Sequence, residues 1–195
     1  MTDKNKLIGF FQRSSLISLD RAEEIAELFE KRLIIKNEYQ LTNRKICNEY
    51  LFLEEGFMRS YTYDVNQQEV TTGFFSSGHL VFEVSSFFNR TVSKENIQAL
   101  TDCSGWYITY DQLNMLFHTI PEFREFGRSI LVKGFAALKI RMLSMINETA
   151  EVRYVNLVKS NPEIFQHAPL KMIASYLGIT DTSLSRIRKE FTKKD

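Results

Sequence analysis

The stretch PLKMIASYLGITDTSLSRIRKEF, residues 169–191, contains two short amphipathic segments joined by a glycine turn. Pro169 suits the first turn of a helix, where its missing N–H costs nothing. Gly178 stands where a helix often ends in a left-handed residue. Thr180 offers a hydroxyl that can cap the segment that follows. The pattern predicts a helix-turn-helix.

The second helix of this pair has an apolar face and a polar face. Leu184, Ile187 and Phe191 recur at helical spacing on one side. Arginine can bind guanine through two hydrogen bonds, hydroxyls reach phosphates or base edges, and lysine neutralises phosphate. We therefore expect a surface for double-stranded DNA on the other side, although an ordinary helix pair with a solvated polar face is the alternative. The expected DNA-binding residues are Thr180, Asp181, Thr182, Ser183, Ser185, Arg186, Lys189 and Lys193.

Basic charge is concentrated near the end of the chain. The net charge of the 195 residues is only +1, which by itself indicates no nucleic-acid binding. From residue 151 onward there are eight Lys and Arg against five Asp and Glu, whereas the preceding part has seventeen against nineteen. The excess of cations therefore lies in the part of the chain that contains the expected helix-turn-helix, where cations would be needed to contact DNA phosphates.

The remaining composition is that of an ordinary reduced protein. Cys47 and Cys103 are isolated, which predicts neither a disulfide framework nor a zinc site. No apolar run resembles a signal peptide or reaches membrane-spanning length. We expect a cytoplasmic protein that makes no membrane contact.

The first half of the chain has the pattern of short strands. Runs rich in β-branched and aromatic residues are separated by Asn, Gly and Asp, and further strands are expected at residues 96–100 and 106–109. Regularly spaced strands of this length predict a small barrel or jelly roll. Before them, Ser18 can cap a helix that continues to Phe29. The runs are LIIK, EYQL, YLFLEE, FMRSYTY, VTTGFF and HLVFEV.

Pro121 begins a segment whose apolar residues recur at three- and four-residue steps over about six turns. We expect a long helix at residues 121–146 that pairs with the same helix of a second copy, although packing against the barrel alone is the alternative. The expected dimerisation residues are Phe126, Ile130, Phe135, Leu138 and Met142. The fold is thus expected to be α+β, with a sensor domain at 1–120, the dimerisation helix at 121–146 and a helix-turn-helix domain at 147–195.

This order of elements resembles the cyclic-AMP receptor protein/FNR (CRP/FNR) superfamily of bacterial transcription regulators. The most specific segments are LGITDTSLSRIRK at 177–189, GFMRSYTYD and EVTTGFFSSGHLVFE within 56–83, and IQALTDCSGWYITYDQL at 97–113. The resemblance implies a cyclic-nucleotide-binding-like β-roll (a double-stranded jelly roll) and a homodimer whose recognition helices enter successive major grooves. It also implies contact with RNA polymerase, and it aligns Arg186 with the base-reading arginine of the family.

The sensor half departs from the members that bind cyclic AMP. In those members a Gly-Glu pair precedes an Arg-Ser pair that holds the cyclic phosphate; here Phe82 precedes Glu83, and Ser93 stands at the arginine position. A cyclic phosphate would therefore lack the arginine that binds it through two hydrogen bonds. We expect an effector other than cyclic AMP. The sequence leaves open whether this effector is a small apolar ligand or an anionic one, or whether the protein has no ligand at all. The pocket expected from the resemblance comprises Phe82, Glu83, Val84, Arg90, Ser93 and Lys94.

Cofactor and enzyme hypotheses have little support in the sequence. An iron–sulfur cluster needs about four cysteine ligands, and for a haem His79 alone stands at a suitable turn. His79, His118 and His167 lie far apart and belong to no nucleophile or phosphate-binding motif. We therefore expect no cofactor, no metal site and no catalytic residues.

Two features of the C-terminal part leave a second hypothesis open. Only four residues follow Phe191, so the wing hairpin of many family members is expected to be absent, which predicts weaker and more salt-dependent DNA binding. Asp181 would have to accept from a cytosine amine or be repelled by phosphate. The alternative is a ligand-binding or protein-interaction module whose helix-turn-helix is vestigial.

Overall fold

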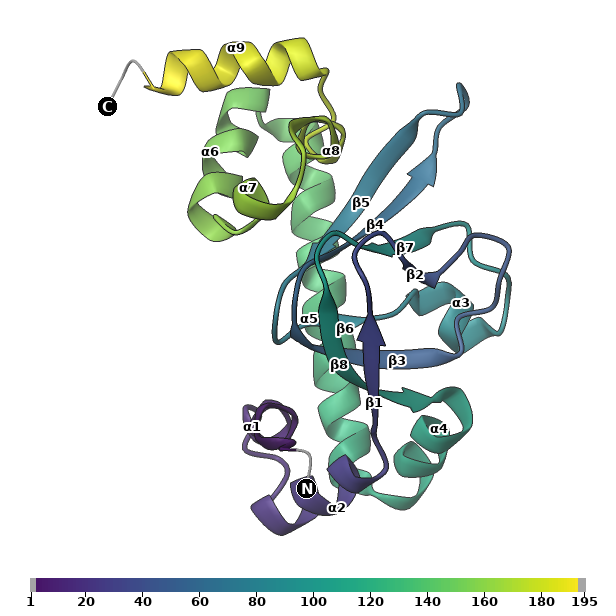
Figure 1. Cartoon of the computed structure of the whole chain (residues 1–195). Coiled ribbons are helices and arrows are strands. Elements are labelled where there is room, and N and C mark those ends of the chain that lie inside the picture. Colours follow the sequence, from purple (N-terminus) through teal and green to yellow (C-terminus); the bar gives the residue numbers. More distant parts are fainter. Residues whose placement is uncertain (1–2, 193–195) are drawn as a thin grey trace.

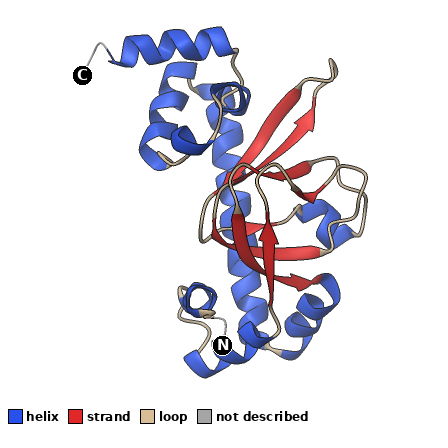
Figure 2. Cartoon of the chain, in the orientation of Figure 1, coloured by secondary structure: helices blue, strands red, loops and turns tan. Residues whose placement is uncertain are grey.

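The computed structural model describes residues 3–192, and its helices lie at both ends of a central group of strands (Figures 1 and 2). Two helices precede the strands, α1 (Asn5–Gln12) and α2 (Leu19–Glu27). Ser18 caps α2 as expected, because its side chain accepts a hydrogen bond from the Arg21 N–H. The sequence pattern did not predict α1, whose Leu7, Phe10 and Phe11 are buried.

The strands form two antiparallel four-stranded sheets, with the orders β1-β8-β3-β6 and β2-β7-β4-β5. This arrangement confirms the predicted β-roll. The inner faces bury a core of leucine, isoleucine and aromatic residues, which continues onto α1, α2 and the start of the long helix. The strands are β1 (Glu30–Ile34), β2 (Tyr39–Leu41), β3 (Glu49–Glu55), β4 (Met58–Tyr63), β5 (Glu69–Phe75), β6 (Leu80–Val81), β7 (Asn96–Ala99) and β8 (Cys103–Thr109).

One predicted strand is wrong over most of its length. The run HLVFEV was expected to be extended, but β6 covers only Leu80–Val81 and a helix, α3 (Val84–Asn89), begins directly after Glu83. The reason is local, since the Glu83 carboxylate accepts hydrogen bonds from the backbone N–H groups of Ser85 and Ser86 and so caps the helix.

Two consecutive helices follow the roll. A capping box at Thr109 and Gln112 begins α4 (Tyr110–Thr119), and Pro121 lies in the first turn of α5 (Pro121–Asn147). The first turns of α5 are packed against the roll and the N-terminal helices, but every residue from 131 to 140 is exposed. Figure 1 shows α5 extending past the roll to the C-terminal helices.

Four helices complete the described chain: α6 (Ala150–Ser160), α7 (Ile164–His167), α8 (Leu170–Tyr176) and α9 (Asp181–Thr192). Thr149 caps α6 by accepting from the Val152 N–H. The apolar residues of these helices form a second core, and two roll residues, Phe57 and Leu100, belong to it. The C-terminal helices are therefore packed against the roll as well as joined to α5.

Two negative observations apply to residues 3–192. No helix combines the length and the apolar character needed to cross a membrane. No three or more His, Cys, Asp or Glu side chains gather as metal ligands would.

Cys47 and Cys103 are free thiols, and burial raises the pKa of both.

Candidate nucleic-acid interface and effector pocket

The turn between α8 and α9 has the geometry that its sequence predicts. Gly178 has φ +68°, a conformation in which other residues are strained, and a Cβ at this position would collide with the Met145 side chain of α5. The Ile179 N–H donates to the Ala174 carbonyl and closes the end of α8. The turn is therefore tight and lies against the end of the long helix.

Thr180 begins α9 as predicted. Its Oγ1 accepts a hydrogen bond from the Ser183 N–H at 3.2 Å and lies 2.9 Å from the Thr182 Oγ1 and 3.0 Å from the Ser183 Oγ. Three hydroxyls thus gather at the N-terminus of α9, where backbone N–H groups and the helix dipole also favour an anion.

The two faces of α9 differ as the sequence predicts. Leu184 and Ile187 are buried, with exposed fractions of 0% and 4%, and pack on α8 and α6 residues of the second core. Ser183 is half-buried, and Lys193 lies outside the described residues. The other expected DNA-binding residues are exposed: Thr180, Asp181, Thr182, Ser185, Arg186 and Lys189. Figure 1 shows α9 at the end of the molecule farthest from α1 and α2.

Arg186 has an acidic neighbour at the start of α6. The pKa of Glu151 is lowered by its own backbone N–H and by the Thr149 hydroxyl, and the Arg186 charge contributes to the same direction. Because Glu151 is exposed, water weakens this attraction. Arg186 is therefore available to an anionic partner that offers two acceptors.

The residues that the family resemblance implies for a cyclic nucleotide make contacts within their own domain. Both Glu83 carboxylate oxygens are used to cap α3, at 3.0 Å from the Ser85 N and 2.7 Å from the Ser86 N. Phe82 packs its ring 4.6 Å from the ring of Tyr50. Ser93 is buried. Its hydroxyl donates a hydrogen bond to the Glu95 carbonyl and accepts one from the Glu95 N–H. None of these three side chains offers a donor to phosphate.

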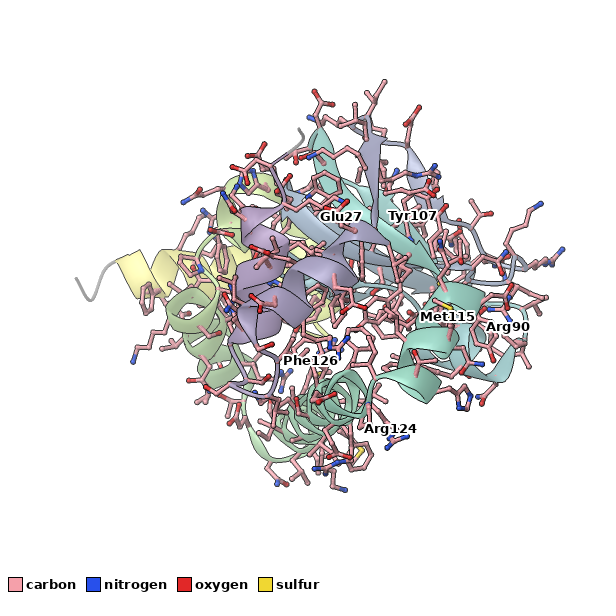
Figure 3. The ribbon with its side chains drawn as sticks, turned by 90° about the horizontal axis from the view of Figure 1, so that it is seen from below. Glu27, Arg90, Tyr107, Met115, Arg124 and Phe126 are labelled. Atoms are coloured by element: carbon pink, nitrogen blue, oxygen red, sulfur yellow. The ribbon has the colours of Figure 1, made fainter. Side chains whose placement is uncertain are left out.

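The two cations expected in this pocket are directed elsewhere. The Arg90 guanidinium donates to the carbonyl oxygens of Cys47 and Phe87 and to the Asn48 side chain, and it lies 4.2 Å from the Tyr110 ring centroid. In Figure 3 it lies at the edge of the molecule, away from α5. Lys94 is exposed on the roll surface. Glu83, Arg90 and Ser93 are thus engaged by neighbouring residues of their own domain, and the six-residue pocket stays a prediction.

Glu95 lies near the charges of both Glu83 and Arg141. Burial raises the pKa of the Glu95 carboxyl, and the nearby Glu83 charge raises it further, whereas a hydrogen bond with Thr72 and the Arg141 charge lower it. The Glu83 and Glu95 carboxylates thus disfavour a neighbouring anion, whereas the Arg141 charge favours one.

A cavity of about 490 Å³ lies between the roll and α5. Two of the expected pocket residues, Phe82 and Val84, line it, together with Gly134 and Leu138 of α5 and Phe10 of α1. Its titratable lining residues are His79 and Lys133, and the rest of the wall is almost entirely apolar. Its volume lies in the range of small-molecule sites, about 300–1,000 Å³.

The expected dimerisation residues divide into two groups. Phe126 is 2% exposed and packs against Phe10 and Phe11, so it belongs to the core of its own subunit and the expectation for it is incorrect. Figure 3 shows it between α5 and the N-terminal helices, whereas Arg124 points outward. Ile130 is half-buried against the same core. Phe135, Leu138 and Met142 are 72%, 62% and 45% exposed.

The sequence patterns did not indicate the contacts between the roll and the helix-turn-helix. Arg141, an interruption in the apolar pattern of α5, donates to Thr72 O of β5 and to Tyr176 O of α8. A signal in the sequence was the place of Arg141 among the apolar residues Leu138, Met142 and Met145.

Comparison with known proteins places these observations in a family context. Residues 34–119 match the model of the cyclic nucleotide-binding domain. A comparison with curated proteins gave no significant match. Among solved structures, the global regulator CLP of Xanthomonas campestris is 17% identical, with a TM-score of 0.69 over 88% of this chain and 90% of that one.

Two further structures have the same fold. FixK2 of Bradyrhizobium japonicum is 15% identical, with a TM-score of 0.73 over 85% of each chain. The catabolite activator protein of Thermus thermophilus is 14% identical, with a TM-score of 0.59 over 95% of this chain and 87% of that one. At this identity the likeness shows the fold, and it extends over most of the chain. Residues 34–119 therefore match the cyclic nucleotide-binding domain, and the chain that contains them has the fold of these regulators.

Proposed function

We propose that this protein is a homodimeric, sequence-specific DNA-binding transcription regulator whose roll responds to an effector other than cyclic AMP. The observation that carries the proposal is the division of α9 into a face buried by Leu184 and Ile187 and an exposed face with hydroxyls at its start and Arg186 and Lys189 farther along. A helix presented in this way can lie in a major groove with Arg186 toward base edges.

The dimer is supported by the exposed part of α5. A soluble helix with ten consecutive exposed positions, many of them large and apolar, lacks a partner surface for Phe135, Leu138 and Ile146. A twofold pair of α5 helices would cover these side chains and would place two α9 helices on one duplex.

The effector would bind in the cavity between the roll and α5. Its apolar wall suits an apolar molecule and cannot satisfy the many polar groups of a nucleotide, each of which would lose hydrogen bonds to water. The cavity is bordered by Gly134 and Leu138, next to the exposed ridge of α5, so an occupant would also contact the proposed dimer seam.

The test is to isolate and sequence genomic fragments retained by the purified protein, with and without an extract of the source cells. We expect enrichment of a pseudo-palindromic site by the wild type and its loss in Arg186→Ala. Lys45→Ala, which removes an exposed cation from the roll, is the matched control and should retain the same fragments. A wild-type protein that enriches no sequence, or an Arg186→Ala variant that enriches the same ones, would contradict the proposal.

One observation favours the second candidate, an interaction module with a vestigial helix-turn-helix. Asp181 is exposed at the start of α9, where phosphate would repel it unless it accepts from a cytosine amine. The substitution Asp181→Asn distinguishes the DNA-binding regulator from the interaction module. Under the DNA-binding proposal this variant changes which sequences are retained, and under the alternative neither protein retains specific DNA.

A further inference from the structure

The β4–β5 hairpin of the roll is joined directly to the first helix of the helix-turn-helix. The Thr71 N–H of β5 donates to Ser175 Oγ of α8 at 3.1 Å, and the same Ser175 Oγ lies 3.1 Å from Thr71 Oγ1. Figure 1 shows α8 beside this hairpin. A strand of the sensor domain thus bonds a helix more than one hundred residues away in sequence.

Arg141 ties the long helix to both of these elements. Its Nη1 donates to Thr72 O of β5 at 2.7 Å and its Nη2 to Tyr176 O of α8 at 3.2 Å, while its guanidinium lies 4.1 Å from the Tyr176 ring centroid. Hydrogen bonds from a charged donor are about twice as strong as neutral ones, and the planar guanidinium can bind two acceptors at once. One side chain therefore fixes three elements at a single point.

An aromatic group supports this polar junction. Phe57, 2% exposed, packs its ring 5.8 Å from Phe74 of β5 and 5.2 Å from His167 of α7. Phe74 in turn lies 5.2 Å from Tyr176. The roll and the C-terminal helices are thus joined by a continuous apolar contact, and Arg141 lies at its edge beside Tyr176.

The position of α8 determines the position of α9. Leu184 and Ile187 of α9 pack in the same buried core as Ile173 and Ala174 of α8, and Gly178, with φ +68°, permits the tight turn that joins the two helices. A shift of the hairpin would therefore be transmitted to the exposed face of α9 as a rigid-body movement of the helix pair.

We propose that Arg141 is a positioning residue for DNA binding: together with Ser175 it clamps the helix-turn-helix to the β4–β5 hairpin and holds α9 in the arrangement that meets DNA. The proposal rests on the proposed function and adds a direct route from roll to helix-turn-helix within one subunit. An effector that displaces the hairpin would release the clamp and lower DNA affinity.

The first test compares Arg141→Ala with Lys139→Ala, which removes an exposed cation two residues earlier on the same helix. We expect Arg141→Ala to weaken binding to the selected DNA site by about tenfold to a hundredfold, the scale of hydrogen bonds from a charged donor, and Lys139→Ala to change it by less than about twofold. Equal affinity of Arg141→Ala and wild type would overturn the proposal.

A second readout does not depend on DNA. Because the Thr71 N–H is bonded to Ser175 Oγ, its hydrogen exchange reports directly on the clamp. We expect faster exchange of this amide in Arg141→Ala and in Ser175→Ala than in wild type or Lys139→Ala. Ser175→Ala removes a single half-buried hydroxyl and keeps the test possible if Arg141→Ala does not fold.

A third experiment restores the clamp by other means. Because Thr71 Oγ1 and Ser175 Oγ are 3.1 Å apart, Thr71→Cys with Ser175→Cys can form a disulfide after a small adjustment. In the Arg141→Ala background, oxidation should return DNA affinity to within about threefold of wild type, and dithiothreitol should remove the gain. If the oxidised protein did not recover its DNA affinity, this result would contradict the clamp.

These outcomes separate the clamp from the proposed function. If wild type binds no specific DNA, the proposed function fails, and the Thr71 exchange alone decides whether the clamp exists. Unchanged exchange in both Arg141→Ala and Ser175→Ala would overturn it. If wild type binds DNA but the variants bind equally well, the clamp fails while the proposed function stands.

Discussion

The Glu83 carboxylate lies 2.7 Å from the backbone N–H of Ser86 and closes the first turn of α3. An acid at this position is what the family resemblance implies for a ribose contact, but in this chain the helix itself already uses both oxygens. A cyclic nucleotide would have to remove the cap, at a cost of about 0.5–2 kcal/mol, and the Arg90 guanidinium is already bonded to Cys47, Phe87 and Asn48.

We therefore predict that cyclic AMP does not bind. A ligand present at about one hundred times its dissociation constant stabilises a protein by about 2.7 kcal/mol, so the melting temperature is a sensitive measure. It should stay unchanged at millimolar cyclic AMP or cyclic GMP. A rise that saturates with either nucleotide would contradict the interpretation of Glu83 as a structural cap.

Substitution of Arg186 should reduce sequence discrimination more than affinity for DNA in general. If its guanidinium binds a guanine through two hydrogen bonds, Arg186→Ala costs about 1–3 kcal/mol on the cognate site and little on unrelated duplexes. Affinities for both should be measured at several salt concentrations. An equal loss on all sequences would instead assign Arg186 to phosphate.

Lys189 provides the contrasting case. It is exposed one turn after Arg186, and we expect Lys189→Ala to weaken binding to all duplexes alike. The slope of log affinity against log salt should decrease by about one, because one phosphate contact is lost. An unchanged slope would exclude Lys189 from the phosphate interface.

A charged residue in the exposed ridge of α5 should produce monomers. Phe135 is 72% exposed in the single chain, and in a twofold helix pair Phe135→Glu would bury two carboxylates, each costing several kcal/mol. Sedimentation velocity should then detect a monomer at concentrations where wild type is a dimer. Val65→Glu, at the most exposed apolar residue outside α5, is the control that should leave the dimer intact. A dimeric Phe135→Glu protein would place the subunit contact elsewhere.

Local patterns were sufficient to predict the helix-turn-helix and most of the roll. Thr180, Gly178 and the stripe of Leu184 and Ile187 each act within one or two helical turns, so their spacing alone determines the helix ends and the buried face. Short strands separated by turn residues predicted the roll for the same reason.

Contacts between distant segments could not be predicted in this way. Phe126 has the same spacing as Phe135, but it lies in the core because α1 covers that part of α5. The run HLVFEV has the composition of a strand, yet Glu83 captures two backbone N–H groups and begins a helix. Arg141 and Ser175 acquire their roles only when β5 lies beside α8.

Glu95 should make the protein less stable as the pH rises. Burial and the Glu83 charge raise its pKa in the folded state above the ordinary value of 4.5, against the opposing effects of Thr72 and Arg141. The folded state then binds more protons than the unfolded state between these two pKa values, so this residue's contribution to stability falls as the pH rises through that interval.

Glu95→Gln removes this dependence. We expect the variant to be more stable than wild type at pH 7. The difference should vanish below pH 4.5, because the protonated Glu95 carboxyl of wild type is then neutral, like the amide of the variant. Urea unfolding at several pH values measures the effect. A variant that is less stable than wild type at pH 7 would show that the carboxylate is needed by its neighbours.

Gly134 gives the sharpest test of whether the cavity beside α5 is used. A glycine in the middle of a helix costs about 0.5–1 kcal/mol relative to alanine, and a Cβ at Gly134 would meet nothing within 4 Å in the single chain. Gly134→Ala should therefore raise the melting temperature by about 1–4 °C. Gly9→Ala is the matched control, since Gly9 lies in α1 with equally open space around it.

The two alanine variants should differ in function although both gain stability. Gly134 lines the cavity and belongs to the exposed ridge, so an added Cβ would reduce the space for an effector or for the second α5 helix. We expect Gly134→Ala to weaken dimerisation, or to abolish the change in DNA binding that cell extract produces, while Gly9→Ala behaves as wild type. If Gly134→Ala kept both properties, the open space at this glycine would have no role in binding, and the effector site would have to be sought away from α5.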